Sequence, residues 1–159
     1  MTPDNPPRLL ADFHRPPGVI KADYTDFQVE ELPLYPFDGT GTHVYFLLEK
    51  AGLSTMQAVR DIARVLNVKQ HDIGFAGLKD ARAVTRQWLS LEHIDPERLT
   101  ALNIPRLRIV EFTRHHNKLR LGHLSANQFI IKVRETDTTR AADLEQALQT
   151  LHTRGVPNY

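Results

Sequence analysis

The sequence predicts an α+β domain with a mixed, largely antiparallel sheet and flanking helices. The first observation is the order of the predicted elements: strands follow one another in pairs, and helices separate the pairs. The second is size, because 159 residues fit one domain that can bury a core. The third is composition, since 41% hydrophobic and 25% charged residues are ordinary for a globular protein.

Two strands and one helix are expected in the first part of the chain. Part of "IKADYTDFQVEELPL" carries apolar and aromatic side chains near every second position, and "THVYFLLEK" is rich in β-formers between glycines. The helix lies in "STMQAVRDIARVLNV", where Ser54 and Gln57 form a capping box. Helical spacing gives it a buried face of Met56, Val59, Ile62, Ala63 and Leu66.

The middle of the chain continues with a short buried strand in "DIGFAGL" and another in "TRQWLSL". The glycines of the first allow a backbone or a ligand to approach closely. Asp95 as N-cap and Pro96 at the first helical position then begin a short helix that runs through Leu102.

The last elements are strands in "RLRIVEFTR" and "QFIIKVRE", followed by a helix. Alternation in the second strand places Phe129, Ile131 and Val133 on one side, with Lys132 and Arg134 on the other. The helix has Gly155 as its C′ residue and an apolar face of Ala141, Leu144, Leu148 and Leu151.

Charge is unevenly distributed, although the net charge is only +1. Residues 68–134 carry 12 basic and 6 acidic side chains, whereas residues 1–67 carry 6 and 9. A basic middle third could present one face to a polyanion, but arginines scattered over a solvated face give the same numbers. There is no cysteine and no apolar run of membrane-spanning length. We therefore expect a cytoplasmic protein without a membrane partner.

Asp80 is the first candidate for chemistry. It follows Lys79 at the end of a small-residue run, and Arg82 and Arg86 come soon after. Basic neighbours would keep the carboxylate ionised and attract phosphate, and an ionised carboxylate in a cleft acts as a nucleophile or a base. The structural alternative is that Asp80 caps the turn in "ARAV".

A basic stretch, "PRLRIVEFTRHHNKLRLGH", is the second candidate. Its cations alternate with Phe112 and aliphatic residues, as on a strand pair that faces a nucleic-acid backbone. A metal site is not expected, because His115 and His116 are adjacent and would point to opposite sides of a strand.

"SANQFIIKV" is the third candidate, because Asn127 and Phe129 would share one face of a strand. An amide and an aromatic ring together can read the edge and the flat side of a base. The alternative is a turn asparagine and a core phenylalanine, and a core position is likewise the alternative for Phe27.

The chain resembles the N-terminal part of the TruD-type tRNA pseudouridine synthases. The resemblance runs from about Lys21 to the end of the chain, and "AGLKD" followed by "AVTRQ" is its most specific part. It is carried by "IKADYTDFQVEELP", "GTHVYFLLEK", "GFAGLKDARAVTRQWLSL", "HHNKLRLGHLSANQFIIKVRE" and "RGVPNY".

This resemblance implies a pseudouridine synthase core with an inserted second domain, and isomerisation of uridine to pseudouridine in tRNA without a cofactor or metal. In bacteria the usual target is the thirteenth position, in the D arm. The family's catalytic aspartate falls on Asp80, its aromatic on Phe27 and its amide on Asn127. Further substrate-binding candidates are Lys21, Lys79 and Phe129. Candidates for contact with the RNA backbone are Arg82, Arg86, Arg114, Lys118 and Arg120.

Family members continue past "GVPNY", so the resemblance makes residues 1–159 the N-terminal portion of the catalytic domain, ending where the inserted domain would begin. The missing C-terminal half of the same protein is then an expected partner, and the chain alone is expected to be inactive. One alternative is a non-catalytic RNA-binding module. Another is a hydrolase, which usually needs a second carboxylate or a metal, and neither is evident near Asp80.

Overall fold

The computed structural model describes residue 10 and residues 13–156. Two compact units divide the chain: residues 20–132 form the larger one, and residues 1–19 with 133–159 form the other. The end of the "RGVPNY" motif, residues 157–159, lies outside the described residues.

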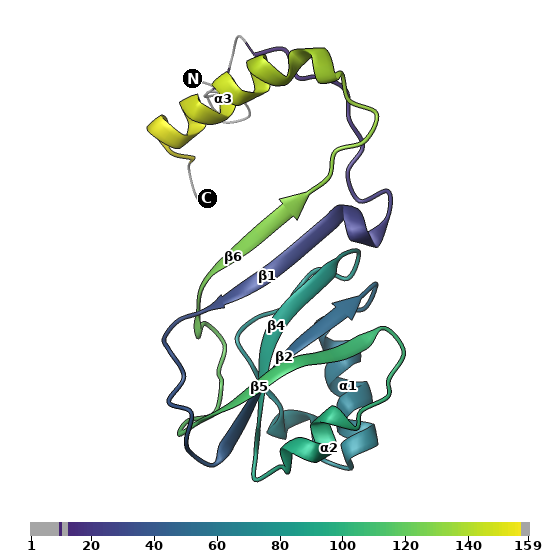
Figure 1. Ribbon diagram of the computed structural model, residues 1–159, viewed down its shortest axis with the longest axis vertical. Helices are drawn as coiled ribbons and strands as arrows, with labels where there is room; N and C mark the ends of the chain where they lie inside the picture. The colour runs from purple at the N-terminus through teal and green to yellow at the C-terminus, as the bar shows by residue number, and fades with distance from the viewer. Residues whose placement is uncertain (1–9, 11–12, 157–159) are drawn as a thin grey trace, which may run out of the picture. The chain divides into compact units, whose positions relative to one another are not determined.

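A mixed six-stranded sheet organises the larger unit, in the order β5-β2-β4-β1-β6 with β3 also beside β4 (Figure 1). Strand β1 runs parallel to β4, whereas the other pairings are antiparallel. The predicted α+β class is therefore confirmed. The strands are β1 (Phe27–Pro33), β2 (His43–Ala51), β3 (Gly74–Phe75), β4 (Val84–Glu92), β5 (Leu107–His115) and β6 (Leu124–Ile131).

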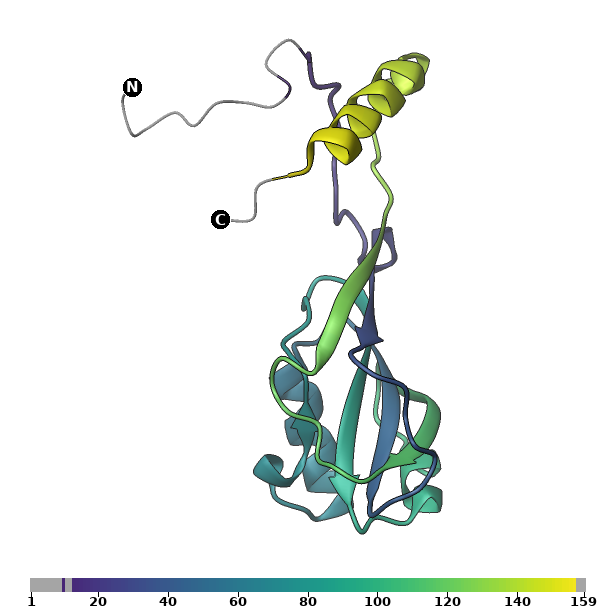
Figure 2. The ribbon, with the colours of Figure 1, turned by 90° about the vertical axis from the view of Figure 1, so that its left-hand side faces the viewer.

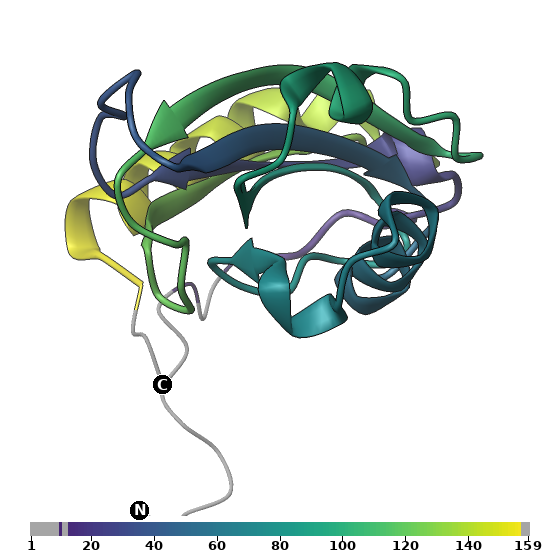
Figure 3. The ribbon, with the colours of Figure 1, turned by 90° about the horizontal axis from the view of Figure 1, so that it is seen from below.

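Helix α1 (Thr55–Leu66) lies against one face of the sheet (Figure 3). Its buried side chains pack with alternate residues of β2, namely Val44, Phe46 and Leu48. The short helix α2 (Pro96–Thr100) adds Leu99 to the same core. On the opposite face Tyr45, Leu47, Ala76, Trp88 and Leu119 form a second cluster, with Phe37 and Leu124 packed against it. Both faces of β2 are thus covered, which accounts for its continuous apolar sequence.

The sequence signals that mark the starts of α1 and α2 are confirmed. Ser54 and Gln57 form the predicted capping box, and Asp95 caps α2 with Pro96 in its first turn. Two expectations were wrong in detail: α2 ends at Thr100, and Met56 is exposed at 42%.

Thr55 takes the buried position beside Met56, because its hydroxyl donates to Gln87 at 2.8 Å and accepts from the Lys79 backbone N–H at 2.9 Å. The first turn of α1 is therefore oriented by polar contacts, which an apolar periodicity does not record.

Strand β4 changes partner along one of its sides. Residues Gln28–Glu30 of β1 pair with Val84–Arg86, whereas β3 pairs with Leu89 and Ser90. Between the two stretches, the Trp88 N–H donates to the Glu31 carboxylate at 3.1 Å. A buried side chain thus completes the hydrogen bonding where one neighbouring strand leaves β4 and the next begins.

Gly74 in β3 permits the close approach that its sequence predicts. A Cβ there would overlap the Leu119 carbonyl oxygen and the Ser90 hydroxyl. The segment before β6 therefore packs directly on the β3 backbone.

In the smaller unit, helix α3 (Ala141–Arg154) is continuous (Figure 2) and follows a 3₁₀ turn at Thr138–Arg140. Gly155 ends α3 with a φ of 75°, as the C-cap residue and not at the predicted C′ position. Val133 was expected in the last strand, but that strand ends at Ile131, and the next backbone pairing is a bridge between Val19 and Arg134. None of the described helices is long and apolar enough to cross a membrane.

Candidate active site

Asp80 lies in the irregular segment between β3 and β4, and its side chain is 41% exposed. One carboxylate oxygen accepts a hydrogen bond from the Lys21 Nζ at 2.7 Å. No helix begins at "ARAV", and no described backbone N–H contacts this carboxylate, so the capping alternative lacks support. The structure thus presents a solvent-accessible carboxylate with one adjacent cation.

Lys21 connects Asp80 to an aromatic ring. Its ammonium also lies 3.9 Å from the centroid of the Phe27 ring, a cation–π contact. The Lys21 carbonyl accepts a hydrogen bond from the Arg82 guanidinium at 3.2 Å. The backbone of Lys21 has a φ of 57°, uncommon for a residue with a Cβ and typical of strained functional positions. Three separate contacts therefore fix this lysine.

Phe27, Phe129 and Asn127 lie on one face of the β1–β6 pair, as the spacing of Asn127 and Phe129 predicted. Phe129 is paired in register with Val29, and Asn127 with Glu31. The two rings meet edge to face with centroids 5.9 Å apart. Phe27 is only 8% exposed, whereas Phe129 is 51% exposed. Phe129 is therefore the ring of the pair that has a free surface for a planar ligand.

Asn127 has a buried amide oxygen, Oδ1, that has no hydrogen-bond partner among the described residues. Buried polar atoms are normally satisfied, so an exception needs an explanation. A donor from a bound base would supply the missing partner.

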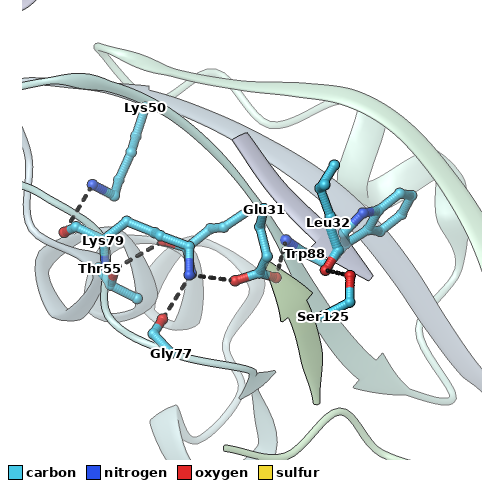
Figure 4. A network of polar contacts seen from close by, with 9 residues as sticks. Glu31, Leu32, Lys50, Thr55, Gly77, Lys79, Trp88 and Ser125 are labelled. Carbon is cyan, nitrogen blue, oxygen red and sulfur yellow. Dashed lines mark hydrogen bonds and ion pairs between the residues drawn. The ribbon is translucent and has the colours of Figure 1, made fainter. Parts of the chain in front are cut away.

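The side chain of Lys79 is buried and is directed at Glu31 (Figure 4). Its Nζ lies 2.6 Å from Glu31 Oε2, and both side chains are almost fully buried. The positive charge beside Asp80 accordingly comes from Lys21, which is distant in sequence, and Lys79 anchors the loop to β1. Glu31 was not a sequence candidate, although it alternates with Phe27 and Val29 on the inward face of β1.

Lys50, the penultimate residue of β2, was also not a candidate from the sequence. It shares the inward side of β2 with Val44, Phe46 and Leu48, and it is fully buried. Its Nζ donates to the carbonyl oxygens of Leu53 at 2.6 Å and Asp80 at 2.8 Å. A lysine at an inward strand position was the available signal.

The predicted RNA-backbone residues fall into two groups. Arg86, Arg114 and Lys118 have their cationic groups engaged. Arg86 contacts Glu49 at 2.9 Å and Glu30 at 3.8 Å. Arg114 donates to the Gly41 carbonyl and Lys118 to the His71 carbonyl. Arg82 and Arg120 are exposed, and Arg82 makes a hydrogen bond to the Lys21 carbonyl but no ion pair among the described residues.

Hydrogen bonds and charge keep the Arg86 pair ionised. The hydrogen bond to Glu49 raises the pKa of Arg86. Burial favours the neutral carboxyl of Glu49, but hydrogen bonds from Arg86 and Arg108 outweigh it and lower the pKa of Glu49. Arg86 is therefore a less available phosphate ligand than Arg82.

Arg120 and Lys118 border a groove of about 590 Å³ with Tyr35 and His123. Phe27 is the first of the seven residues of β1, and Tyr35 follows the last of them. The length of the strand puts roughly 20 Å between the two. The structure thus places Arg82 near Asp80 and Arg120 at the other end of β1. Within residues 13–156, no group of three or more acidic or histidine side chains is arranged to hold a metal ion.

Comparison with known proteins gives one family. The family model described as tRNA pseudouridine synthase D (TruD) matches residues 8–159. A tRNA pseudouridine synthase D of Geobacter metallireducens is 50% identical over 141 residues, covering 89% of this chain and 35% of the relative. That of Geobacter sp. strain M21 is 45% identical over 150 residues, covering 94% and 38%.

A solved structure agrees with this result. The crystal structure of a TruD-family protein from Methanosarcina mazei matches with a TM-score of 0.81 and 28% identity, covering 89% of this chain and 33% of that one. The chain spans about a third of the length of these proteins.

Proposed function

Because the chain belongs to the TruD family of tRNA pseudouridine synthases, we propose that it supplies the catalytic aspartate for converting uridine to pseudouridine in tRNA. The observation that carries the proposal is the exposed Asp80 carboxylate held 2.7 Å from the Lys21 ammonium, which itself lies over the Phe27 ring. We place the protein in the cytoplasm, and the target at the thirteenth position of the D arm, as the family resemblance implies.

The reaction breaks the bond between N1 and C1′ of the uridine and forms a bond between C5 and C1′. C5 loses its proton, and N1 gains one, so no oxidant, reductant or cofactor is consumed. An ionised Asp80 serves as nucleophile or base. Lys21 balances its negative charge and leaves the other carboxylate oxygen unoccupied by any described residue.

Phe129 and Asn127 are suited to hold an extruded base. Phe129 offers a half-exposed ring for stacking, and the unpaired Oδ1 of Asn127 offers an acceptor to an N–H on the edge of the base. Arg82, on the same side as Lys21, is the described cation best placed for a neighbouring phosphate.

We propose that β6 pairs with the part of the family's proteins that lies outside the segment matched by this chain. Among the described strands β6 pairs only with β1, and Ile130 and Ile131 on it are 59% and 46% exposed. Unpaired strand edges with apolar side chains favour pairing with another chain segment. The chain alone is accordingly expected to lack part of the site.

The test uses a hybrid in which this chain replaces the matching segment of the Geobacter metallireducens relative. Tritium released from tRNA labelled at C5 of uridine measures turnover, because C5 loses its proton. In the hybrid, Asp80→Asn keeps size and removes charge, so turnover should fall by orders of magnitude, while tRNA affinity holds or rises slightly. Glu97→Gln, an exposed residue of α2, is the matched control. Near-normal turnover by Asp80→Asn would overturn the assignment, and binding without turnover by the unaltered hybrid would indicate an RNA-binding module.

A further inference from the structure

We propose that Lys50 is a positioning residue for Asp80, acting from beneath the loop through backbone carbonyl groups. This inference rests on the proposed function for its catalytic consequence. Its structural part stands on the hydrogen bonds of Lys50 to backbone carbonyl groups of the loop that carries Asp80, and Figure 4 shows Lys50 beside Lys79 of this loop.

The ammonium of Lys50 connects two segments that are far apart in sequence. It donates to the Leu53 carbonyl at 2.6 Å, in the turn before α1, and to the Asp80 carbonyl at 2.8 Å. The Lys79 carbonyl lies at 3.5 Å. A single cation therefore joins the start of α1 to the two consecutive peptide groups that set the position of Asp80.

Other buried side chains hold the rest of this loop. The Lys79 N–H donates to the Thr55 hydroxyl at 2.9 Å, and Gln87 donates to the Gly77 carbonyl at 3.3 Å. The Lys79 side chain is fixed by Glu31. These groups restrain the backbone before Asp80. The donor to the Asp80 carbonyl itself, among the described residues, is Lys50.

Lys50 is an unfavourable choice if stability alone is at stake. It is 0% exposed and has no carboxylate within ion-pair distance among the described residues. Burial is the main cause that lowers the pKa of Lys50 to about 8; the charge of Lys79 acts in the same direction, and that of Asp80 opposes both. A buried unpaired cation is costly, so we infer that its benefit is the geometry of the loop.

Charge complementarity adds a second effect on Asp80. Asp80 is the carboxylate whose charge favours the protonated Lys50, and the interaction is reciprocal. Lys21 at the side chain and Lys50 below the backbone thus place positive charge on two sides of Asp80. Removing Lys50 should displace the carboxylate and weaken the field around it.

The experiment is Lys50→Met in the hybrid protein, which keeps an unbranched side chain, one heavy atom shorter, and removes its charge and donors. Leu99→Ala is the control, because Leu99 of α2 is fully buried in the hydrophobic core and is not among the residues that hold the Asp80 loop. Both variants are measured well below their unfolding midpoints. The readouts are kcat and KM on tRNA, and amide hydrogen exchange by mass spectrometry over peptides spanning residues 76–83.

For Lys50→Met we expect kcat to fall by roughly a hundredfold, as for a misplacement of about 1 Å, with KM little changed. Exchange should rise selectively in residues 76–83. Leu99→Ala should lower the melting temperature while leaving kcat and the loop exchange close to their original values.

Unaltered exchange in the loop of Lys50→Met, or a kcat within about twofold of the original, would overturn the proposal. So would an equal loss of kcat in Leu99→Ala, because destabilisation would then explain both. If the original hybrid makes no pseudouridine, the proposed function fails, and the exchange result still decides whether Lys50 holds the loop. Should Lys50→Met not fold, Lys50→Gln, which keeps amide donors without the charge, replaces it with the same criteria.

Discussion

Replacing Glu31 with glutamine should destabilise the protein strongly, because it removes the only described counter-charge of a buried lysine. The side chains of Glu31 and Lys79 are 1% and 5% exposed, and their charged atoms lie 2.6 Å apart. Breaking such a pair on one side costs about 3–5 kcal/mol. Glutamine retains an oxygen that can accept from the Trp88 N–H, so the loss of stability reports the removal of the negative charge alone. For a chain of this size the cost corresponds to a fall of roughly 10 °C in melting temperature.

The measurement is urea unfolding of the 159-residue chain, followed by circular dichroism. Glu30→Gln is the matched control, because Glu30 is next in sequence, half-exposed, and 3.8 Å from Arg86. It should cost less than about 1 kcal/mol. Glu31→Gln combined with Lys79→Met should recover most of the stability, since it leaves no unpaired buried charge and keeps an acceptor for the Trp88 N–H. If Glu31→Gln behaves like Glu30→Gln, the reasoning about this pair is wrong.

Three further predictions concern other parts of the molecule. Phe27→Ala should cost about 3–5 kcal/mol in a melting curve because the ring is buried, whereas Phe129→Ala should keep the melting point and weaken productive tRNA binding by roughly tenfold; the opposite assignment of effects would contradict the proposed base contact. The folded pKa of Lys50 is about 8, below its ordinary value of 10.5. Between these pH values the unfolded chain therefore binds more protons than the folded chain. The free energy of unfolding should accordingly rise from pH 8 to pH 10.5, by at most about 3 kcal/mol. Lys50→Met should lack this rise, and equal slopes in both proteins would refute it. Light scattering of the 159-residue chain should show self-association that Ile130→Lys reduces, and a monomer before and after substitution would count against an exposed β6 edge.

Much of the fold could be predicted from local signals. The capping box at Ser54, the N-cap at Asp95 and the glycine at 155 mark helix ends through hydrogen bonds within a few residues, and each appears in the structure. The common face of Asn127 and Phe129 also followed, because a strand alternates strictly. Such features depend on residues that are close in sequence, so the sequence alone is enough to predict them.

The polar interior could not be predicted in the same way. Lys50, Glu31 and Lys79 look like surface residues by type, since charged side chains are rarely fully buried. Their burial depends on partners contributed by other segments: Lys50 contacts carbonyls of residues 53 and 80, and Glu31 contacts Lys79. Lys21 and Asp80, 59 residues apart, meet only once the sheet is assembled. Long-range pairs of this kind leave no periodic signal.

The position of Trp88 gives this protein an intrinsic fluorophore close to its most sensitive charges. It is the only tryptophan in the chain, its indole packs on Phe37 with ring centroids 4.5 Å apart, and its backbone N–H donates to Glu31. Opening of the region between β1 and β4 would admit water to the indole and shift its emission to longer wavelength. Stopped-flow fluorescence can therefore follow whether binding of tRNA tightens or loosens this part of the sheet, in real time and without an added label.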